Sequence, residues 1–195
     1  MDYVICEYGK VKKEFPEFRS VMENLQNELI NLAQQSWPSM KYGGIYPKAG
    51  EFGKTTIMPE LFINMSGVTL TTWLQNLTAL GHQTIMAGSQ AGGTIAEDYK
   101  IGLVGLAFLD KAIRISEIKM QISDKKLPRI NIEECMAYEQ PAIVFEDGFI
   151  LDEEHGFDLY AYVLSQGYQR IKLIGLQLNR VPNKLQVSNT GAAIT

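Results

Sequence analysis

The chain has 195 residues, a formal net charge of −4 and a hydrophobic fraction of 46%. This length suits one domain with extensions, and the apolar content is enough for a hydrophobic core, which excludes a disordered chain. The net negative charge argues against a protein whose main role is to neutralise phosphates, because its basic residues cluster only briefly, at 10–13 and 125–129. We therefore expect no strong nucleic-acid partner.

The cysteine count and the apolar runs bear on the compartment. Cys6 and Cys135 are the only cysteines, and two thiols so far apart in a chain of this length predict free thiols and no disulfide framework. The first residues lack the apolar run of a signal peptide, and the longest apolar stretch, 101–109, is about half of what a membrane-spanning helix needs. We expect synthesis in the cytoplasm, a soluble product and no transmembrane segment.

Residues 16–35 predict an amphipathic helix. Apolar side chains recur there at steps of four and three residues, namely Phe18, Met22, Leu25, Leu29 and Leu32. Pro16 suits the first turn, and Trp37-Pro38 ends the helix. Two heptads are too few for a stable isolated coiled coil, so the apolar stripe must lie on another surface. The chain's own sheet is the simpler candidate, and a neighbouring subunit is the alternative.

The next segment contains many helix and strand breakers. Glycines and prolines are frequent over residues 38–56, which indicates an ordered loop, and short strands are expected at 55–58 and 61–65. A short second helix is then predicted, with Thr71 or Thr72 as its cap and Gly81 as its C-terminal cap. One face of this helix would carry five apolar residues: Leu70, Trp73, Leu74, Leu77 and Leu80.

After Gly81 the periodicity is that of strands. Strands are predicted at 82–87, 99–109, 113–123, 129–132, 142–145 and 149–151, with two more within 157–180 that are joined by a turn at 165–167. The apolar phase reverses near 116–117 and again near 173–175, and each reversal predicts a β-bulge. The fold class is therefore mainly β, an antiparallel β-sandwich or jelly roll preceded by the amphipathic helix and the short second helix.

This pattern divides the chain into three parts. Residues 1–80 form an N-terminal helical and loop extension, residues 81–180 form the sandwich, and residues 181–195 form a C-terminal arm. The arm is small and polar apart from a few apolar residues, among them Leu185, Val187 and Ile194. It is either a disordered tail or an arm that becomes ordered on a neighbour.

No group of catalytic or metal-binding residue types in the sequence has the spacing of a known motif. The densest ionisable cluster is the segment 152–158, whose carboxylates do not match a calcium loop and fit a charged hairpin turn better. His82 and His155 are too few for a three-histidine metal site. The glycine-rich run 88–93 matches neither a nucleophile elbow nor a phosphate loop. The sequence therefore predicts no catalytic, cofactor-binding or metal-binding residue.

The order of features from Asp98 to Val181 resembles the single jelly-roll proteins that form the shells and vertices of non-tailed viruses. The features are the long bent strand 113–123, the turn 124–128, the strand 148–151 and a hairpin over 157–180, with a helix before them and an arm after. The resemblance implies a structural function. The chain lacks the strongly basic arm that genome packaging would need.

Three functions follow from these observations. The first is a self-assembling structural protein of a viral capsid or related particle, without catalytic activity, whose partners are copies of itself and other particle proteins, and whose location is the virion. Its interface residues would be Phe18, Met22, Leu25, Leu29, Leu32, Leu185, Val187 and Ile194. The second is a carbohydrate-binding β-sandwich module with Trp37, Tyr42 or Tyr46 as stacking platforms. The third and least favoured is a jelly-roll enzyme with 152–158 as its acidic site.

Overall fold

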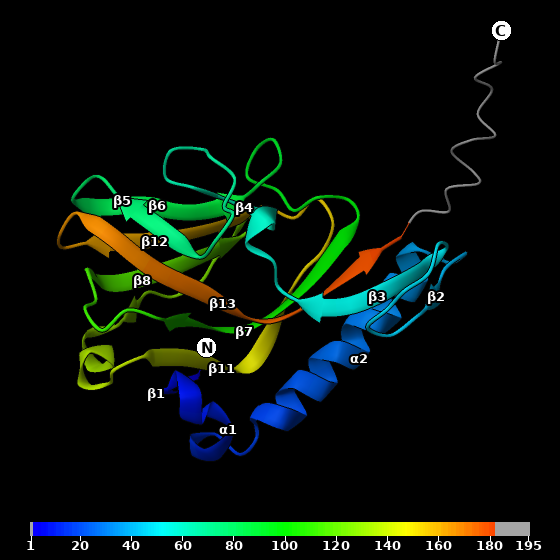
Figure 1. The fold of residues 1–195 in the computed structure, drawn as a ribbon, viewed down its shortest axis with the longest axis horizontal. Helices are drawn as coiled ribbons and strands as arrows, with labels where there is room; N and C mark the ends of the chain where they lie inside the picture. Colours follow the sequence, from blue (N-terminus) through cyan, green and yellow to red (C-terminus); the bar gives the residue numbers. More distant parts are fainter. Residues whose placement is uncertain (1, 182–195) are drawn as a thin grey trace, which may run out of the picture.

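The computed structural model describes residues 2–181, and residues 1 and 182–195 lie outside the described part. The fold is mainly β, with 48% strand and 19% helix. Two curled sheets lie one over the other, and the long helix α2 runs along the outer side of one of them (Figure 1). All strand pairs are antiparallel except β2 with β3.

Sheet I has the strand order β1-β11-β7-β13-β3-β2, and β5 pairs with the first half of β13. Its strands are β1 (Tyr3–Glu7), β2 (Lys41–Tyr42), β3 (Glu51–Thr56), β5 (Leu74–Leu77), β7 (Tyr99–Phe108), β11 (Pro141–Leu151) and β13 (Gly167–Arg180).

Sheet II has the order β10-β8-β12-β6-β4, and β9 pairs with β8. Its strands are β4 (Phe62–Asn64), β6 (Gly81–Gly88), β8 (Ile115–Ile122), β9 (Lys125–Lys126), β10 (Ile130–Asn131) and β12 (Phe157–Val163). The helices are α1 (Val11–Glu14) and α2 (Phe18–Ser36), with 3-10 turns at Tyr8–Lys10, Pro59–Leu61 and Glu133–Ala137.

The main hydrophobic cluster takes side chains from both sheets. Leu106 and Phe108 of β7 belong to it together with Met86 of β6 and Leu159 of β12, and all four are buried. A second cluster lies on the outer face of sheet I, where the predicted amphipathic helix is confirmed as α2. Its buried members are Leu25, Leu29, Ala33, Trp37, Phe52, Val104, Leu176 and Leu178.

Two glycines of β7 allow close packing on this sheet. A Cβ on Gly105 would lie 2.2 Å from the carbonyl oxygen of Ile143, so the neighbouring backbone excludes a side chain there, as predicted. A Cβ on Gly102 would lie 2.7 Å from Leu29 Cδ1. Gly102 therefore lets α2 come down onto the sheet.

One of the two predicted β-bulges is confirmed, and the other is assigned to the wrong strand. The register between β13 and β7 does shift near residue 174, but the extra residue is Val104 of β7, and β13 keeps its alternation. The apolar residues of β13 change face there because α2 covers the outer side of the sheet. The register between β12 and β8 shifts where Tyr162 faces Glu117 and Val163 faces Ile115, which leaves Ser116 as the extra residue. As a result, Ile115 and Ile118 are both buried although their spacing is odd.

The predicted short second helix is wrong. Residues 74–77 form strand β5 instead, which pairs with β13 from Gly167↔Leu77 to Arg170↔Leu74. The first half of β13 offers unpaired backbone groups, and pairing with them outweighs the helical spacing of the leucines. Gly81 does have the positive φ expected of it, at 83°, but it begins β6.

The hairpin predicted over 157–180 is also wrong in its pairing. Its two strands exist as β12 and β13, but β12 belongs to sheet II and β13 to sheet I. The turn between them is held by Arg114, whose Nη1 donates to the carbonyl oxygen of Gln166 at 2.9 Å and to Ser165 Oγ at 3.2 Å. The connection therefore passes from one sheet to the other.

Strands from both sides of residue 80 share each sheet. In sheet I, β3 pairs with β13, and in sheet II, β4 pairs with β6. The residues predicted as an N-terminal extension, 1–80, thus contribute strands β1 to β5 to the same two sheets.

Candidate functional site

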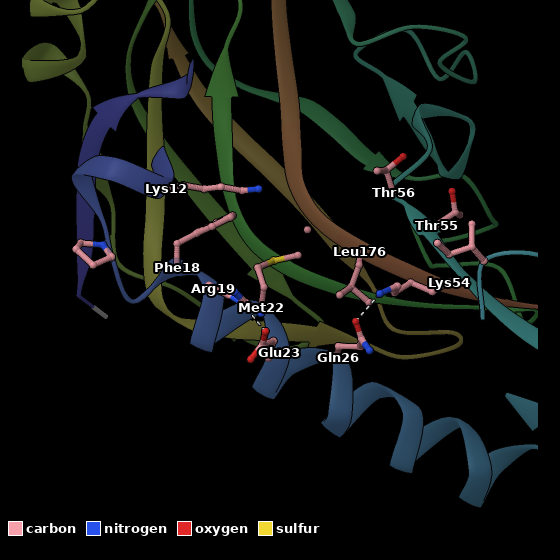
Figure 2. Close-up of a pocket in the computed structure, with 13 residues that line it drawn as sticks. Lys12, Phe18, Arg19, Met22, Glu23, Gln26, Lys54, Thr55, Thr56 and Leu176 are labelled. Carbon is pink, nitrogen blue, oxygen red and sulfur yellow. Dashed lines mark hydrogen bonds and ion pairs between the residues drawn. The ribbon is translucent and has the colours of Figure 1, made fainter. Parts of the chain in front are cut away.

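A groove of about 810 Å³ opens between the N-terminal half of α2 and the outer face of sheet I (Figure 2). Its lining comes from α1, α2, the loop after β2, the end of β3 and residues 175–176 of β13. The lining residues are Lys12, Pro16, Phe18, Arg19, Met22, Glu23, Gln26, Ile45, Lys54, Thr55, Thr56, Gly175 and Leu176.

The floor and one wall of the groove are apolar. Figure 2 shows Phe18 and Met22 reaching from α2 toward Leu176 on β13. Leu176 is buried, whereas Phe18 and Met22 are only half-buried although they lie on the same helix as fully buried Leu29. Apolar side chains therefore remain accessible at this end of α2.

Strand pairing explains why the groove exists. The pairing of β3 with β13 ends at Thr56↔Leu176, and the first half of β13 pairs with β5 instead. The register shift with β7, whose extra residue is Val104, lies where the two partners change. One edge of β13 is therefore left without a neighbouring strand among the described residues at 172–175, close to the start of α2.

Three cationic side chains border the groove. Arg19 Nε donates to Glu23 Oε1 at 2.8 Å, and this contact raises the pKa of Arg19. Lys54 Nζ donates to the neutral amide oxygen of Gln26 at 2.6 Å. Lys12 has no hydrogen bond or ion pair within residues 2–181, and Figure 2 shows its side chain extending over the groove. Three cations and one carboxylate leave two positive charges in excess.

The predicted interface residues are distributed over three environments. Leu25 and Leu29 are buried against the chain's own sheet, which was the simpler of the two alternatives. Phe18 and Met22 line the groove, and Leu32 is half-buried. Leu185, Val187 and Ile194 lie outside the described residues. An intersubunit role for this set stays a prediction.

The acidic segment 152–158 closes over a buried lysine. Lys100 is 1% exposed, and its Nζ contacts Asp152 Oδ1 and lies 3.1 Å from Glu153 Oε1. The same ammonium lies 5.0 Å from the centre of the Trp37 ring. The prediction of a solvated turn therefore holds for Glu154 and His155, which are exposed, and fails for the two carboxylates that face Lys100.

The stacking platforms proposed for a sugar are placed differently from expectation. Trp37 is buried between α2 and sheet I, where Phe52 packs against it with the ring centres 5.6 Å apart, so it cannot stack on a ligand. Tyr42 is half-buried on the same phenylalanine. Tyr46 is 89% exposed in the loop after β2. Of the three, only Tyr46 keeps a free face.

The outer face of sheet II carries a second, shallower hollow of about 240 Å³. Strand register places Tyr162 between His82 and Glu117, and Tyr160 between Thr84 and Lys119. The rings of His82 and Tyr162 meet edge to face at 4.9 Å. No single sequence segment carries this arrangement, because its residues come from β6, β8 and β12.

Charged side chains of both signs lie on the outer face of sheet II. Arg129 Nη1 and His82 Nδ1 lie 3.2 Å and 3.4 Å from Glu117 Oε1. Burial raises the pKa of the Asp158 carboxyl and, together with the charge of Asp158, the pKa of Tyr160. Tyr160 also hydrogen-bonds Asp158 and Thr84. The face therefore presents aromatic edges and hydrogen-bonding groups side by side.

Both cysteines are free, as the sequence predicts, and both are buried. Burial, followed by the charge of Glu14, raises the pKa of Cys6 to about 11. Burial, followed by the charge of Glu134, raises the pKa of Cys135 to about 12. Neither thiol is therefore activated as a nucleophile at neutral pH.

Within residues 2–181, no three histidine, cysteine, aspartate or glutamate side chains gather so as to hold a metal ion. In the same part of the chain, no helix combines the length and apolar character needed to cross a membrane. Comparisons with models of protein families, with curated proteins and with solved structures found no match.

Proposed function

We propose that the two sheets form a jelly roll. In that fold eight strands pair first with eighth, second with seventh, third with sixth and fourth with fifth. Taking β3, β6, β7, β8, β10, β11, β12 and β13 as the eight, the chain pairs β3 with β13, β6 with β12, β7 with β11 and β8 with β10. The resulting orders, β3-β13-β7-β11 and β6-β12-β8-β10, are those that the jelly roll requires.

We further propose that the protein is a self-assembling structural protein of a capsid or related particle, made in the cytoplasm and carried in the virion. The strand order is the observation that carries this proposal, because jelly rolls are a common building unit of viral shells. Copies of the chain are the proposed partners.

Exposed apolar side chains at one end of the molecule support assembly. Leu80, Leu164 and Tyr168 are 61%, 49% and 64% exposed. Val163 pairs with Gly81, so Leu80 and Leu164 extend this pair of strands at the same end. Tyr168 lies beyond the following turn and pairs with Asn76 of β5. We call these three residues the apolar end, and clusters of this kind are typical of protein interfaces.

Sedimentation of the full chain tests the proposal. We expect an oligomer or shell, and we expect Leu164→Asp to reduce assembly while leaving the β-rich circular dichroism unchanged. Gln34→Asp, at an exposed position of α2 outside the apolar end, is the control. A chain ending at Val181 separately tests whether residues 182–195 contribute. A strict monomer of the full chain at high concentration would overturn the structural function.

A second candidate function, saccharide binding, is favoured by the outer face of sheet II. Tyr160 and Tyr162 offer aromatic surface, and Lys119 and Gln121 offer hydrogen-bonding groups beside them. Titration with an oligosaccharide panel should then detect binding that Tyr162→Ala weakens and Tyr46→Ala does not. Binding that only Tyr46→Ala removes would move the site to the loop after β2.

A further inference from the structure

We propose that the groove beside α2 binds an anionic amphiphile, a free long-chain carboxylate whose alkyl chain lies on the apolar floor and whose head group meets Lys12. This inference goes beyond the structural function and does not depend on it. It rests on the size of the groove, on its apolar floor and on its unneutralised positive charge.

The size of the groove favours a small ligand over a protein segment. Small-molecule sites in proteins have volumes of about 300–1,000 Å³, and the groove holds about 810 Å³. Specific protein interfaces bury on the order of 1,200 Å² or more, which needs a broader surface than thirteen lining residues supply. A single alkyl chain fits this volume.

The floor provides the apolar contact that an alkyl chain requires. Phe18, Met22 and Leu176 converge in Figure 2, and Ile45, which is 66% exposed, borders the groove from the loop after β2. Exposed Ile45 and half-buried Phe18, which both line the groove, leave apolar surface in contact with water. Covering that surface with methylene groups is favourable by about 25 cal/mol per Å².

The charge of the rim selects the head group. The two positive charges in excess stand out in a chain whose formal net charge is −4. Lys54 is held by an uncharged amide, and Lys12 has no partner among residues 2–181. An anion at Lys12 would therefore gain a charge-assisted contact without having to break an existing ion pair. A neutral lipid or a cationic amphiphile would gain no such contact.

Calorimetric titration with dodecanoate, below its micellar concentration, tests the proposal. We expect saturable binding of one molecule per chain, about tenfold weaker for Lys12→Glu because an attraction becomes a repulsion. Lys125→Glu reverses the charge of an exposed lysine on β9 of sheet II, which does not line the groove, and should bind as the wild type does. Ile45→Ser, at an exposed position, should weaken binding by removing apolar contact without changing the charge of the groove.

Two controls distinguish binding of a free carboxylate from binding of a neutral amphiphile or of a lipid surface. Dodecanol should bind more weakly than dodecanoate to the wild type and equally to the wild type and Lys12→Glu, because it carries no charge. Vesicles of anionic phospholipid should not retain the protein in flotation. Absence of saturable dodecanoate binding, equal dodecanoate affinity in Lys12→Glu, or flotation of the protein with the vesicles would each overturn the proposal.

Discussion

The outer faces of the two sheets differ in what covers them, and the burial pattern along their strands differs accordingly. In sheet I, the central strand β7 is buried along nearly its whole length, because its inward face meets sheet II and its outward face meets α2. In sheet II, β12 alternates between buried residues and residues that are half-buried or exposed. A run of apolar residues thus indicates a strand covered on both faces, and alternation indicates one bare face.

The strongest test of the covered face is removal of a helix contact. Leu29 is fully buried between α2 and β7. Leu29→Ala should lower the free energy of unfolding by about 2–5 kcal/mol, measured by urea denaturation. Glu28→Ala changes the adjacent exposed position and should cost under about 0.5 kcal/mol. Equal midpoints for the two variants would mean that α2 does not cover sheet I.

A glycine substitution tests how closely α2 approaches. Gly102→Val would place methyl groups against Leu29 and should cost about 1–3 kcal/mol through overpacking. Gly9→Val places the same side chain where no heavy atom lies within 4 Å, and its effect should be smaller. Thermal unfolding of both variants makes the comparison. A larger loss for Gly9→Val would contradict the close packing.

The buried thiols predict a loss of stability in alkali. Unfolded thiols lose their protons from about pH 8.5, whereas Cys6 and Cys135 hold theirs to about pH 11 and 12. Their raised folded-state pKa values therefore contribute stability that is complete below pH 8.5 and is lost as the pH rises. The slope is at most about 1.4 kcal/mol per pH unit for each thiol.

Denaturation midpoints between pH 8 and 10.5 measure this slope. The double variant Cys6→Ala, Cys135→Ala should show a flatter dependence than the wild type. A small slope should remain, because the pKa of Tyr160 is also raised. An unchanged slope in the double variant would show that other groups cause the alkaline loss.

The smallest effect is expected on the bare face of sheet II. Lys119 points outward from β8 and should tolerate Lys119→Ala with a change under about 0.5 kcal/mol. Met120 points inward at the next position, and Met120→Ala should cost about 2–5 kcal/mol. Chemical denaturation of the two variants tests directly whether buried and outward-facing residues alternate along β8. Similar losses for both would mean that the outer face is also covered.

The local spacing of apolar residues predicted the positions of strands and of the long helix better than it predicted which strands pair. The helix over 16–35, most strands after Gly81 and the bulge at Ser116 follow from the spacing of apolar residues in short windows. The bulge at Ser116 was visible because Ile115 and Ile118 break the strand period of two. Such signals depend only on which residues face the same side.

Pairing and the groove were beyond local patterns. Residues 74–77 have helical spacing, but they form a strand because β13, about ninety residues later in the chain, pairs with them. The groove likewise joins Lys12 and Met22 to Lys54 and Leu176, which are close only after sheet I has formed. Trp37 was mistaken for an exposed platform because its burial depends on Phe52 and Lys100.

Strand β13 sets the order in which the chain can acquire its structure. It is the antiparallel partner of β3, β5 and β7. Phe52 of β3, for example, pairs with Arg180 at the C-terminal end of β13. During synthesis on the ribosome, β3 and β5 emerge long before the strand that completes them, so their edges stay unpaired in the nascent chain. Sheet I can therefore close only after nearly all of the described residues have been made, and its long-range pairings place folding in the slow, millisecond-to-second class typical of β proteins.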